Sequence, residues 1–349
     1  MRRTPLFALH SLAGASFAPV VDALVPSSFG ATPMTCEVGR TGAVVVDRAD
    51  RHVVVLRGPD ARRFCNGMFT NNVRSLPVGG ANRHCMVDDK ARIQGLLDLV
   101  CLAEDTFLAV LDGVTAAAFE ARYGKYILFD DVELEDLTAT HAVFGVQGPR
   151  AYEVLAAAGL AAPSEHGAVT VGEGIHVFRS PSTGAGAVGV VVPVAQAQAL
   201  WGAIVGAGAL PCGWDAAEVL RVEAGIARWP VDMGERALLH ELRLVVTCAA
   251  FDKGCYLGQE VIHRIDVMGQ VTKQLWGLDL REDALPPAGA EVRIDDQVVG
   301  EVRSGAREGS RVRVLAVLRK AAWQAGLAVT IHAGERSVAA QVSDLPFPG

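Results

Sequence analysis

The residue of this sequence that most clearly suggests a chemical role is a cysteine with a glycine close to it on each side. Cys255 stands in the run Lys253-Gly254-Cys255-Tyr256-Leu257-Gly258-Gln259-Glu260. Glycine lets the backbone turn sharply and lets a second group approach closely. A nearby ammonium such as that of Lys253 favours the thiolate, which is the nucleophilic form of cysteine. The run therefore predicts a reactive thiol at Cys255 with Lys253 as its activator. The alternative is a buried structural cysteine in a glycine-rich bend.

A second pair of charged residues precedes this run. Arg221 and Glu223 lie two positions apart in Arg221-Val222-Glu223-Ala224-Gly225, so they share one face if the segment is a strand. The planar fork of arginine suits a carboxylate ligand, and we expect Arg221 to face a central channel. The alternative is a structural Arg–Glu network. Gln259 and Glu260 likewise have two interpretations, as ligand contacts or as partners of the loop's own amides.

The run around Cys255 closely resembles the K-G-C-[FY]-x-G-Q-E signature of the YgfZ branch of the YgfZ/GcvT family, which is related to the glycine-cleavage T-protein. Weaker matches follow the family's order from about residue 4 to residue 275: Gly58-Pro59-Asp60-Ala61, Thr70-Asn71-Asn72-Val73, Gly148-Pro149 and Arg221-Val222-Glu223-Ala224-Gly225. The resemblance implies an α+β fold. Two intertwined folate-binding subdomains would occupy residues 1–268 around a central channel, and an antiparallel β-barrel would occupy residues 269–349.

The resemblance also implies a function. YgfZ-type proteins bind tetrahydrofolate and maintain or assemble iron–sulfur enzymes, including radical tRNA-modifying enzymes. The implied partners are folate and iron–sulfur client or assembly proteins, with Cys255 as the functional residue. Candidates for the folate site are Arg221, Glu223, Asn71, Gln259 and Glu260. Two alternatives stay open: an aminomethyltransferase like the T-protein, and a folate-binding scaffold without catalysis.

The carboxylates that the T-protein uses are missing from the matching positions. Its strand carries I-[LI]-D-D, whose second aspartate assists proton movement at the folate nitrogens. Gly95 and Leu96 stand at the two acid positions here, and Ala185 replaces the glutamate that grips the pterin. Asp98 is a candidate substitute acid, because it shares a strand face with Leu96, but it is displaced by roughly 6–7 Å. We therefore expect no glycine-dependent aminomethyl transfer.

Composition narrows the class of protein. Half of the 349 residues are apolar and 20% are charged, which allows a large core. The formal charge of −7 argues against a nucleic-acid binder. Seven scattered cysteines without a CxxC pair indicate reduced thiols and no protein-made metal site. No run approaches the roughly 20 apolar residues of a membrane span, and the N-terminus lacks a dense apolar signal region. We expect a cytoplasmic monomer.

Strands and helices are mixed without regular βαβ alternation, which favours α+β over a doubly wound sheet. The pattern predicts a strand pair over Gly95–Leu102 and Phe107–Leu111 and another strand over Ala142–Val146. It predicts helices over Asp60–Phe69, Val114–Tyr126 and Arg150–Ala158.

The segment Gly184–Gly189 satisfies GxGxxG, the pattern of a dinucleotide-binding loop. That site requires a helix opening on the last glycines. The glycines here precede the strand-like run Val190–Pro193, so a hairpin turn is predicted.

Short strand candidates follow Met268-Gly269 at the spacing of a small antiparallel barrel. They are Leu275–Leu280, Glu291–Ile294, Gln297–Arg303, Arg311–Leu318, Leu327–Ile331 and Ser337–Val342.

Overall fold

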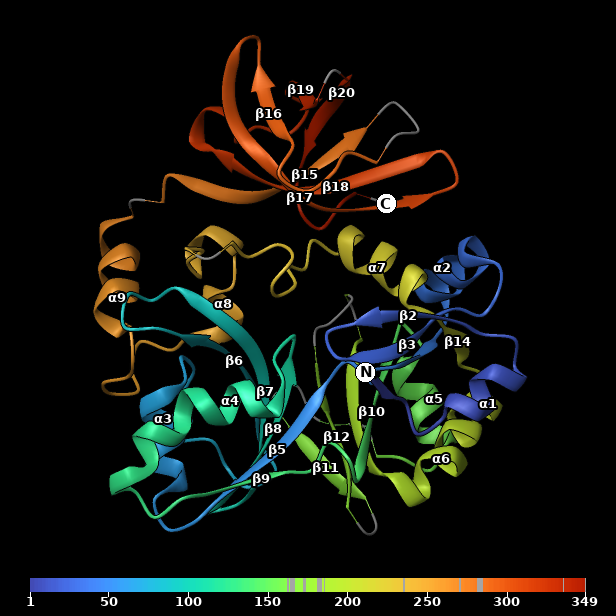
Figure 1. Ribbon diagram of the computed structural model, residues 1–349, viewed down its shortest axis with the longest axis vertical. Helices are drawn as coiled ribbons and strands as arrows, with labels where there is room; N and C mark the ends of the chain where they lie inside the picture. Colours follow the sequence, from blue (N-terminus) through green and yellow to red (C-terminus); the bar gives the residue numbers. More distant parts are fainter. Residues whose placement is uncertain are drawn as a thin grey trace.

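The computed structural model consists of two β-sheets that pack face to face, with a closed β-barrel above them (Figure 1). It describes the chain except for residues 162, 164–166, 172–173, 181–183, 185, 235, 270, 281–284, 335 and 349. The described sheets are not a single parallel sheet with helices on both faces, and the predicted α+β class is confirmed.

The first of the two packed sheets has five antiparallel strands in the order β6-β7-β8-β5-β9. Its outer face is covered by α3 and α4, whose aromatic side chains Phe64, Phe119 and Tyr123 are buried there. The predicted strand pair is the β7–β8 hairpin, and the helix predicted after Asp60 is α3. The bounds are β5 His52–Arg57, α3 Ala61–Met68, β6 Ala81–Val87, β7 Ile93–Ala103, β8 Thr106–Asp112, α4 Ala116–Tyr123, η1 Gly124–Phe129 and β9 Glu133–Asp136.

The second sheet has six strands in the order β11-β12-β13-β10-β4-β14. Helices α5 and α6 cover its outer face, where Trp201 packs edge-on against Phe144. The strand predicted after the GxGxxG segment is β13, so no helix opens on those glycines, while Ala185 lies outside the described residues. The bounds are β4 Val44–Asp47, β10 His141–Gln147, α5 Ala151–Ala157, β11 Ala168–Val171, β12 Ile175–Arg179, β13 Val188–Pro193, α6 Val194–Gly206 and β14 Leu210–Cys212.

The inner faces of the two sheets form a shared apolar layer. Val53, Val110, Val143, Phe178 and Val191 meet there, all almost fully buried. Towards the barrel, β6, β7, β8 and the segment between β4 and β5 carry charged side chains, which lie at the centre of the molecule.

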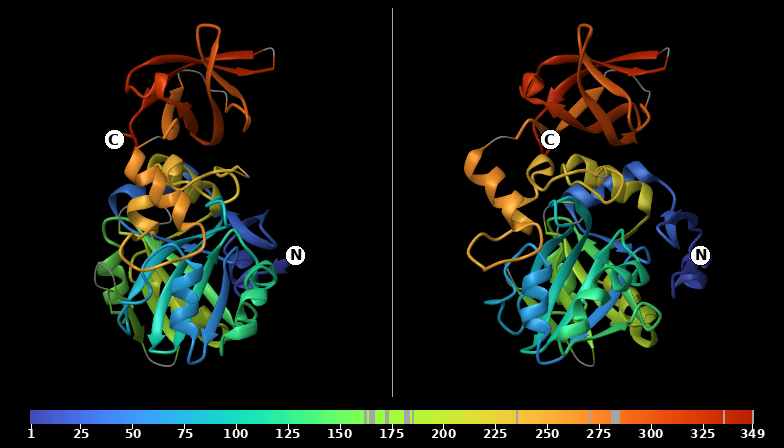
Figure 2. Two further views of the ribbon diagram at one scale, coloured as in Figure 1. Left: turned by 90° about the vertical axis from the view of Figure 1, so that its left-hand side faces the viewer. Right: turned by 60° about the vertical axis from the view of Figure 1, so that its left-hand side comes forward.

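A mostly helical segment connects the second sheet to the barrel. Its elements are α7 Trp214–Glu223, η2 His240–Leu242, α8 Val245–Cys248 and α9 Gln259–Met268, with α9 along one side of the molecule (Figure 2). The prediction of a strand at Arg221–Gly225 is wrong, because these residues form the end of α7 and the turn after it. Buried Ala216, Ala217 and Leu220 have the three- to four-residue spacing of a helix face, a period that a five-residue window does not reveal.

The barrel closes through six antiparallel strands in the order β15-β18-β17-β16-β19-β20. Each predicted strand after Gly269 is found there, several of them longer than predicted. The bounds are β15 Lys273–Leu280, β16 Glu291–Ile294, β17 Gln297–Glu308, β18 Arg311–Arg319, η3 Lys320–Ala322, β19 Ala328–Ala333 and β20 Arg336–Ser343.

The first forty residues pack beside the second sheet and α7. They form a small three-stranded sheet and two helices: β1 Arg2–Arg3, α1 Phe7–Leu12, β2 Ser16–Val20, β3 Ala23–Ser28 and α2 Thr32–Thr41. Among the described residues, no helix has the length and apolar character needed to cross a membrane.

Candidate functional site

The loop between α8 and α9 exposes one thiol. Cys255 is exposed, and the other six cysteines are buried. Gly254 and Gly258 both have positive φ, at +88° and +79°. A Cβ at Gly258 would lie 2.8 Å from the carbonyl oxygen of Asp88, so this glycine allows a close backbone approach. The sharp turn predicted from the glycines is confirmed, and the thiol lies at the surface, not in a packed bend.

Lys253 is buried, and its ammonium faces the protein interior. Its Nζ donates hydrogen bonds to the carbonyl oxygens of Phe69 and Asn71, the latter at 2.7 Å, and lies 4.5 Å from the ring centre of Tyr256. Burial lowers the pKa of Lys253 to about 7. In the described part of the chain, no hydrogen bond joins this nitrogen to the thiol of Cys255. Lys253 therefore anchors the loop, and its activation of the thiol stays a prediction.

Further hydrogen bonds hold the loop against the end of α3. The side-chain amide of Asn66 donates to the carbonyl of Lys253 at 3.0 Å, and the Leu257 N–H donates to the carbonyl of Gly67 at 3.0 Å. Gln259 accepts from the Tyr256 N–H at 3.0 Å, so it satisfies an amide of its own loop. Glu260 is exposed in the first turn of α9, where the helix dipole stabilises a negatively charged side chain.

Asn71 belongs to this support. Its side-chain amide donates to the carbonyls of Arg83 and Thr247, at 3.0 and 3.2 Å, and so ties β6 to α8. Its own carbonyl accepts from Lys253. The structure thus brings together Asn71, Lys253, Cys255 and Gln259 through backbone-directed hydrogen bonds, whereas Arg221 and Glu223 lie elsewhere.

Arg221 is fully engaged in a structural network. It forms a two-pronged ion pair with Glu218, at 3.0 and 2.9 Å, and another ion pair with Asp232 at 2.8 Å. Its remaining donors reach the carbonyl of Ile226 and the hydroxyl of Ser304 on β17. An arginine has five N–H donors, and all five are used. No donor is left for a ligand carboxylate in this arrangement.

Glu223 belongs to a different network. It accepts from Arg40 on α2, at 2.8 and 3.0 Å, and from Arg313 on β18 at 3.0 Å. The expectation that Arg221 and Glu223 share a strand face is therefore wrong, because on a helix residues two apart point in different directions. Both residues attach α7 to the barrel, Arg221 through Ser304 and Glu223 through Arg313.

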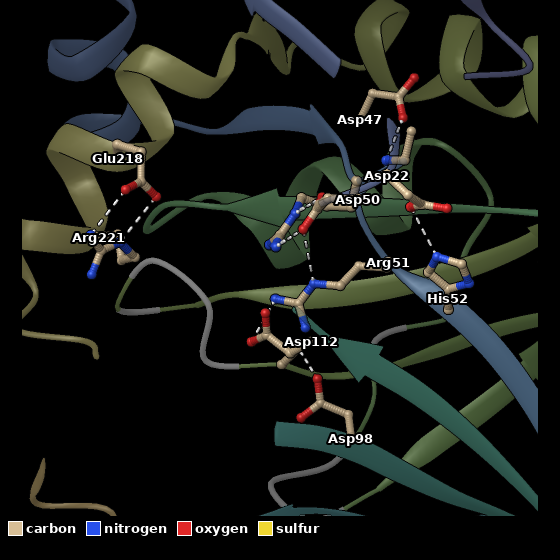
Figure 3. Close-up of polar contacts among 12 residues, drawn as sticks. Asp22, Asp47, Asp50, Arg51, His52, Asp98, Asp112, Glu218 and Arg221 are labelled. Carbon is tan, nitrogen blue, oxygen red and sulfur yellow. Dashed lines mark hydrogen bonds and ion pairs between the residues drawn. The ribbon is translucent and has the colours of Figure 1, made fainter. Parts of the chain in front are cut away.

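A group of paired charges occupies the centre of the molecule, between the sheets and below α7. We call it the central ion-pair cluster; it comprises Arg48, Asp50, Arg51, Arg83, Asp98 and Asp112. Figure 3 shows Arg51 between Asp50 and Asp112, with Asp98 beyond Asp112. All six side chains are buried. Three cations face three anions, so the cluster has no net charge.

Arg83 holds the two aspartates of β7 and β8. Its guanidinium donates to both oxygens of Asp98, at 2.9 and 3.0 Å, and to Asp112 at 2.6 Å. The hydroxyl of Ser180 adds a bond to Asp98 at 2.7 Å. Asp98, the candidate substitute acid, is therefore not free to meet a ligand.

Leu96 is completely buried, and strand register places it directly opposite Asp112 on β8. Asp112 is thus the carboxylate nearest in register to the position at which the T-protein carries its acid. Burial opposes its ionisation, but Arg51 and Arg83 outweigh burial and keep its pKa well below the usual range. A carboxylate with so low a pKa is a poor proton acceptor near neutral pH.

The space beside this cluster is small. A cavity of about 20 Å³ is lined by Arg48, Arg51, Arg83, Asp112, Glu218, Arg221 and Arg228, among others. A second cavity of about 10 Å³ is also lined by Arg48 and Arg51 and lies next to Asp98 and Ser180. Each has room for about one water molecule. A cavity of about 260 Å³ lies between residues 232–242 and the barrel, and none of the predicted site residues lines it. It is lined in part by Asp232, which is ion-paired with Arg221 of the first cavity.

Arg51, Arg83 and Asp112 were not predicted from the sequence as site residues. A charged side chain within an otherwise apolar strand is a signal of a buried ion pair or a functional site. Asp112 ends the largely apolar strand β8, so this signal was present there, whereas Arg83 stands between Asn82 and His84 on β6. It does not identify the partner of each charge, since the partners come from different strands.

The sequence of this chain matches two known protein-family models. Residues 6–253 match the family model of the GCVT N-terminal domain, and residues 273–348 match that of the Glycine cleavage T-protein C-terminal barrel domain. The Aminomethyltransferase of Rubrobacter xylanophilus is 28% identical over 357 residues, which cover 99% of this chain and 94% of that protein. The Aminomethyltransferase of Burkholderia multivorans is 28% identical over 368 residues, covering 99% and 97%.

Among solved structures, the glycine cleavage system aminomethyltransferase T from Bartonella henselae has the same fold. It superposes with a TM-score of 0.89 at 22% identity, covering 99% of this chain and 98% of that chain. At this identity the likeness concerns the fold.

In the described part of the chain, no group of three or more His, Cys, Asp or Glu side chains is placed to hold a metal ion.

Proposed function

The chain belongs to the family defined by the GCVT N-terminal domain, and from this premise we propose that it acts in the assembly or repair of iron–sulfur enzymes through the thiol of Cys255. The observation that carries the proposal is the exposure of this thiol alone among seven. A thiol must reach its target to react, and reactive cysteines lie in accessible positions while structural ones are buried. A persulfide or an exposed cluster of a client enzyme is the target class that fits a surface thiol.

The loop around Cys255 is built to present this thiol. Lys253 and Asn66 fix the backbone on one side, and Gln259 fixes it on the other. Both glycines adopt conformations that other residues rarely adopt. These interactions fix the backbone of the loop and leave the thiol exposed, as the proposed role of Cys255 requires.

Aminomethyl transfer is the second candidate, because the relatives named above are aminomethyltransferases. Against it stand Leu96, which cannot exchange a proton, and Asp98 and Asp112, which are paired with arginines. We expect no turnover with a lipoyl-bound aminomethyl donor and tetrahydrofolate. Turnover near about 1 s⁻¹, within the ordinary enzyme range, would contradict this expectation.

Tetrahydrofolate is the ligand that membership of this family suggests. The described centre does not fit a pterin ring, because its two cavities have only about 20 and 10 Å³ and its charged groups are already paired. The proposal therefore routes no step through folate. It depends on Cys255 and on a client protein.

The test replaces Cys255 by serine in the full-length chain. Cells that lack their own copy receive the wild type, Cys255→Ser, or Cys101→Ser as a matched variant at a buried thiol. The product of a radical iron–sulfur tRNA-modifying enzyme is then quantified by mass spectrometry of nucleosides. We expect Cys255→Ser to fall to the level of the deletion strain and Cys101→Ser to resemble the wild type.

A scaffold without thiol chemistry would give a different result. Cys255→Ser would then support tRNA modification as well as the wild type does, and the proposal would be abandoned. Iodoacetamide labelling of the native protein gives a separate check. We expect one labelled cysteine, Cys255, before unfolding and seven after it. A native protein that resists labelling would make Cys255 a packing residue.

A further inference from the structure

The centre of a two-sheet fold can either bind a ligand or be filled by the protein's own side chains. Here β6, β7 and β8 each direct a charged residue inward: Arg83, Asp98 and Asp112. Register places Arg83 directly opposite Asp98, and Asp112 directly opposite Leu96. These three residues thus form one contiguous patch on the inner face of the sheet.

The segment between β4 of the second sheet and β5 of the first sheet supplies the counterpart. Arg48 and Asp50 follow β4 and form a two-pronged ion pair, with both bonds at 2.8 Å. Arg51 reaches across to Asp112 at 2.9 Å and lies 3.5 Å from Asp50. The cluster therefore spans the gap between the sheets, and each carboxylate within it contacts at least one guanidinium.

The cavities beside the cluster are also too small for a pterin ring. The two cavities that Arg48 and Arg51 line have about 20 and 10 Å³, whereas pockets for small organic ligands have about 300 Å³ or more. A pterin ring would have to displace several buried side chains. Each displaced ion would lose its partner in a site with little water, which is costly.

We infer that the central ion-pair cluster takes the place of a pterin, so that this chain binds no tetrahydrofolate at the centre of its fold. The inference does not depend on the role proposed for Cys255. The chain would then keep the fold of the family while its own charged side chains fill the centre between the two sheets. Leu96 and Arg83 are then two parts of one change, the loss of an acid and the filling of the space beside it.

The experiment is calorimetric titration of the full-length protein with tetrahydrofolate under anaerobic, reducing conditions. The aminomethyltransferase of Rubrobacter xylanophilus serves as the positive control in the same buffer. We expect a one-to-one isotherm for the control. For this chain we expect no saturable heat up to about 1 mM ligand, the upper end of ordinary enzyme KM values. Circular dichroism confirms that the titrated protein is folded.

Two variants locate any binding that is found. Arg83→Met alters the cluster itself, and Arg228→Met alters a less buried residue that lines the cavity of about 20 Å³ and is expected to fold even if Arg83→Met does not. One-to-one binding by the wild type that either variant weakens tenfold or more would overturn the inference. Binding that neither folded variant changes would place the ligand outside the centre and support it. Failure of the tRNA-modification test would leave the inference intact, since that test concerns Cys255.

Discussion

The loop around Cys255 and the central ion-pair cluster are both held by buried cations, but the two cations are used differently. Lys253 donates to backbone carbonyls, so the loop keeps its shape while its thiol stays outside. Arg83 binds two carboxylates, so the charges of the centre satisfy each other and leave little space. A charged residue in a strand therefore does not by itself mark a ligand site. What decides is whether its partners lie within the protein.

The largest effect is expected from breaking the cluster. Arg83→Met leaves Asp98 and Asp112 buried with fewer or no cationic partners, and we expect the free energy of unfolding to fall by about 3–5 kcal/mol. Urea denaturation followed by circular dichroism measures the loss. Arg57→Met is the control, because Arg57 and Glu135 form an ion pair in which both side chains are about half exposed. We expect about 0–1 kcal/mol there. Equal losses in the two variants would show that burial does not distinguish the cluster from the surface.

The next effect concerns the anchor of the loop. The pKa of Lys253 is about 7 in the folded chain and 10.5 for an ordinary lysine. Between these values the unfolded chain binds the additional proton, so stability rises with pH. The cost of burying the ammonium is fully present below pH 7 and is relieved above it. From pH 7 to pH 9 we expect this group to add about 2–3 kcal/mol to the free energy of unfolding.

Lys253→Met separates this contribution from those of other groups. The variant has no titrating side chain at this position, so its stability should rise less steeply than that of the wild type over the same pH range. Parallel stability–pH curves for the two proteins would show that the ammonium of Lys253 keeps an ordinary pKa.

A smaller effect compares the two glycines of the loop. An alanine at positive φ costs about 1–2 kcal/mol. At Gly254 a Cβ meets nothing within 4 Å, whereas at Gly258 it meets the Asp88 carbonyl at 2.8 Å. We expect Gly258→Ala to be the more destabilising variant and to change the rate at which iodoacetamide labels Cys255. Identical unfolding energies and labelling rates would mean that the approach to Asp88 does not set the position of the thiol.

The smallest effect on stability is expected at the thiol itself. Cys255→Ser changes an exposed atom and should leave the free energy of unfolding within about 0.5 kcal/mol of the wild type. Cys85→Ser places a hydroxyl in the apolar core and should cost about 1–3 kcal/mol. Thermal melts of both variants test the contrast. A large loss for Cys255→Ser would indicate a structural role for the thiol.

The β-barrel and the β7–β8 hairpin were predictable because their strands are local patterns of apolar residues and turns. The helix at Arg221–Glu223 was missed because a short window shows no period. The candidate site was predicted in part: the glycines around Cys255 indicate a sharp turn, and the structure has one. The partners of Lys253 and Arg221 were not predictable. Phe69 and Asn71 lie more than 180 positions before Lys253, and Ser304 lies more than 80 positions after Arg221.

The sequence alone determined the class of fold, the family resemblance, the loss of the acid at Leu96 and the presence of a thiol between glycines. These are properties of residue types in order, and each can be read without distances. Only the tertiary structure decided that Cys255 is exposed, that Lys253 points inward and that Arg83, Asp98 and Asp112 pair with one another. Exposure and ion pairing depend on which strands and helices meet in space, because a charge is satisfied by its neighbours within a few ångströms, wherever they lie along the chain.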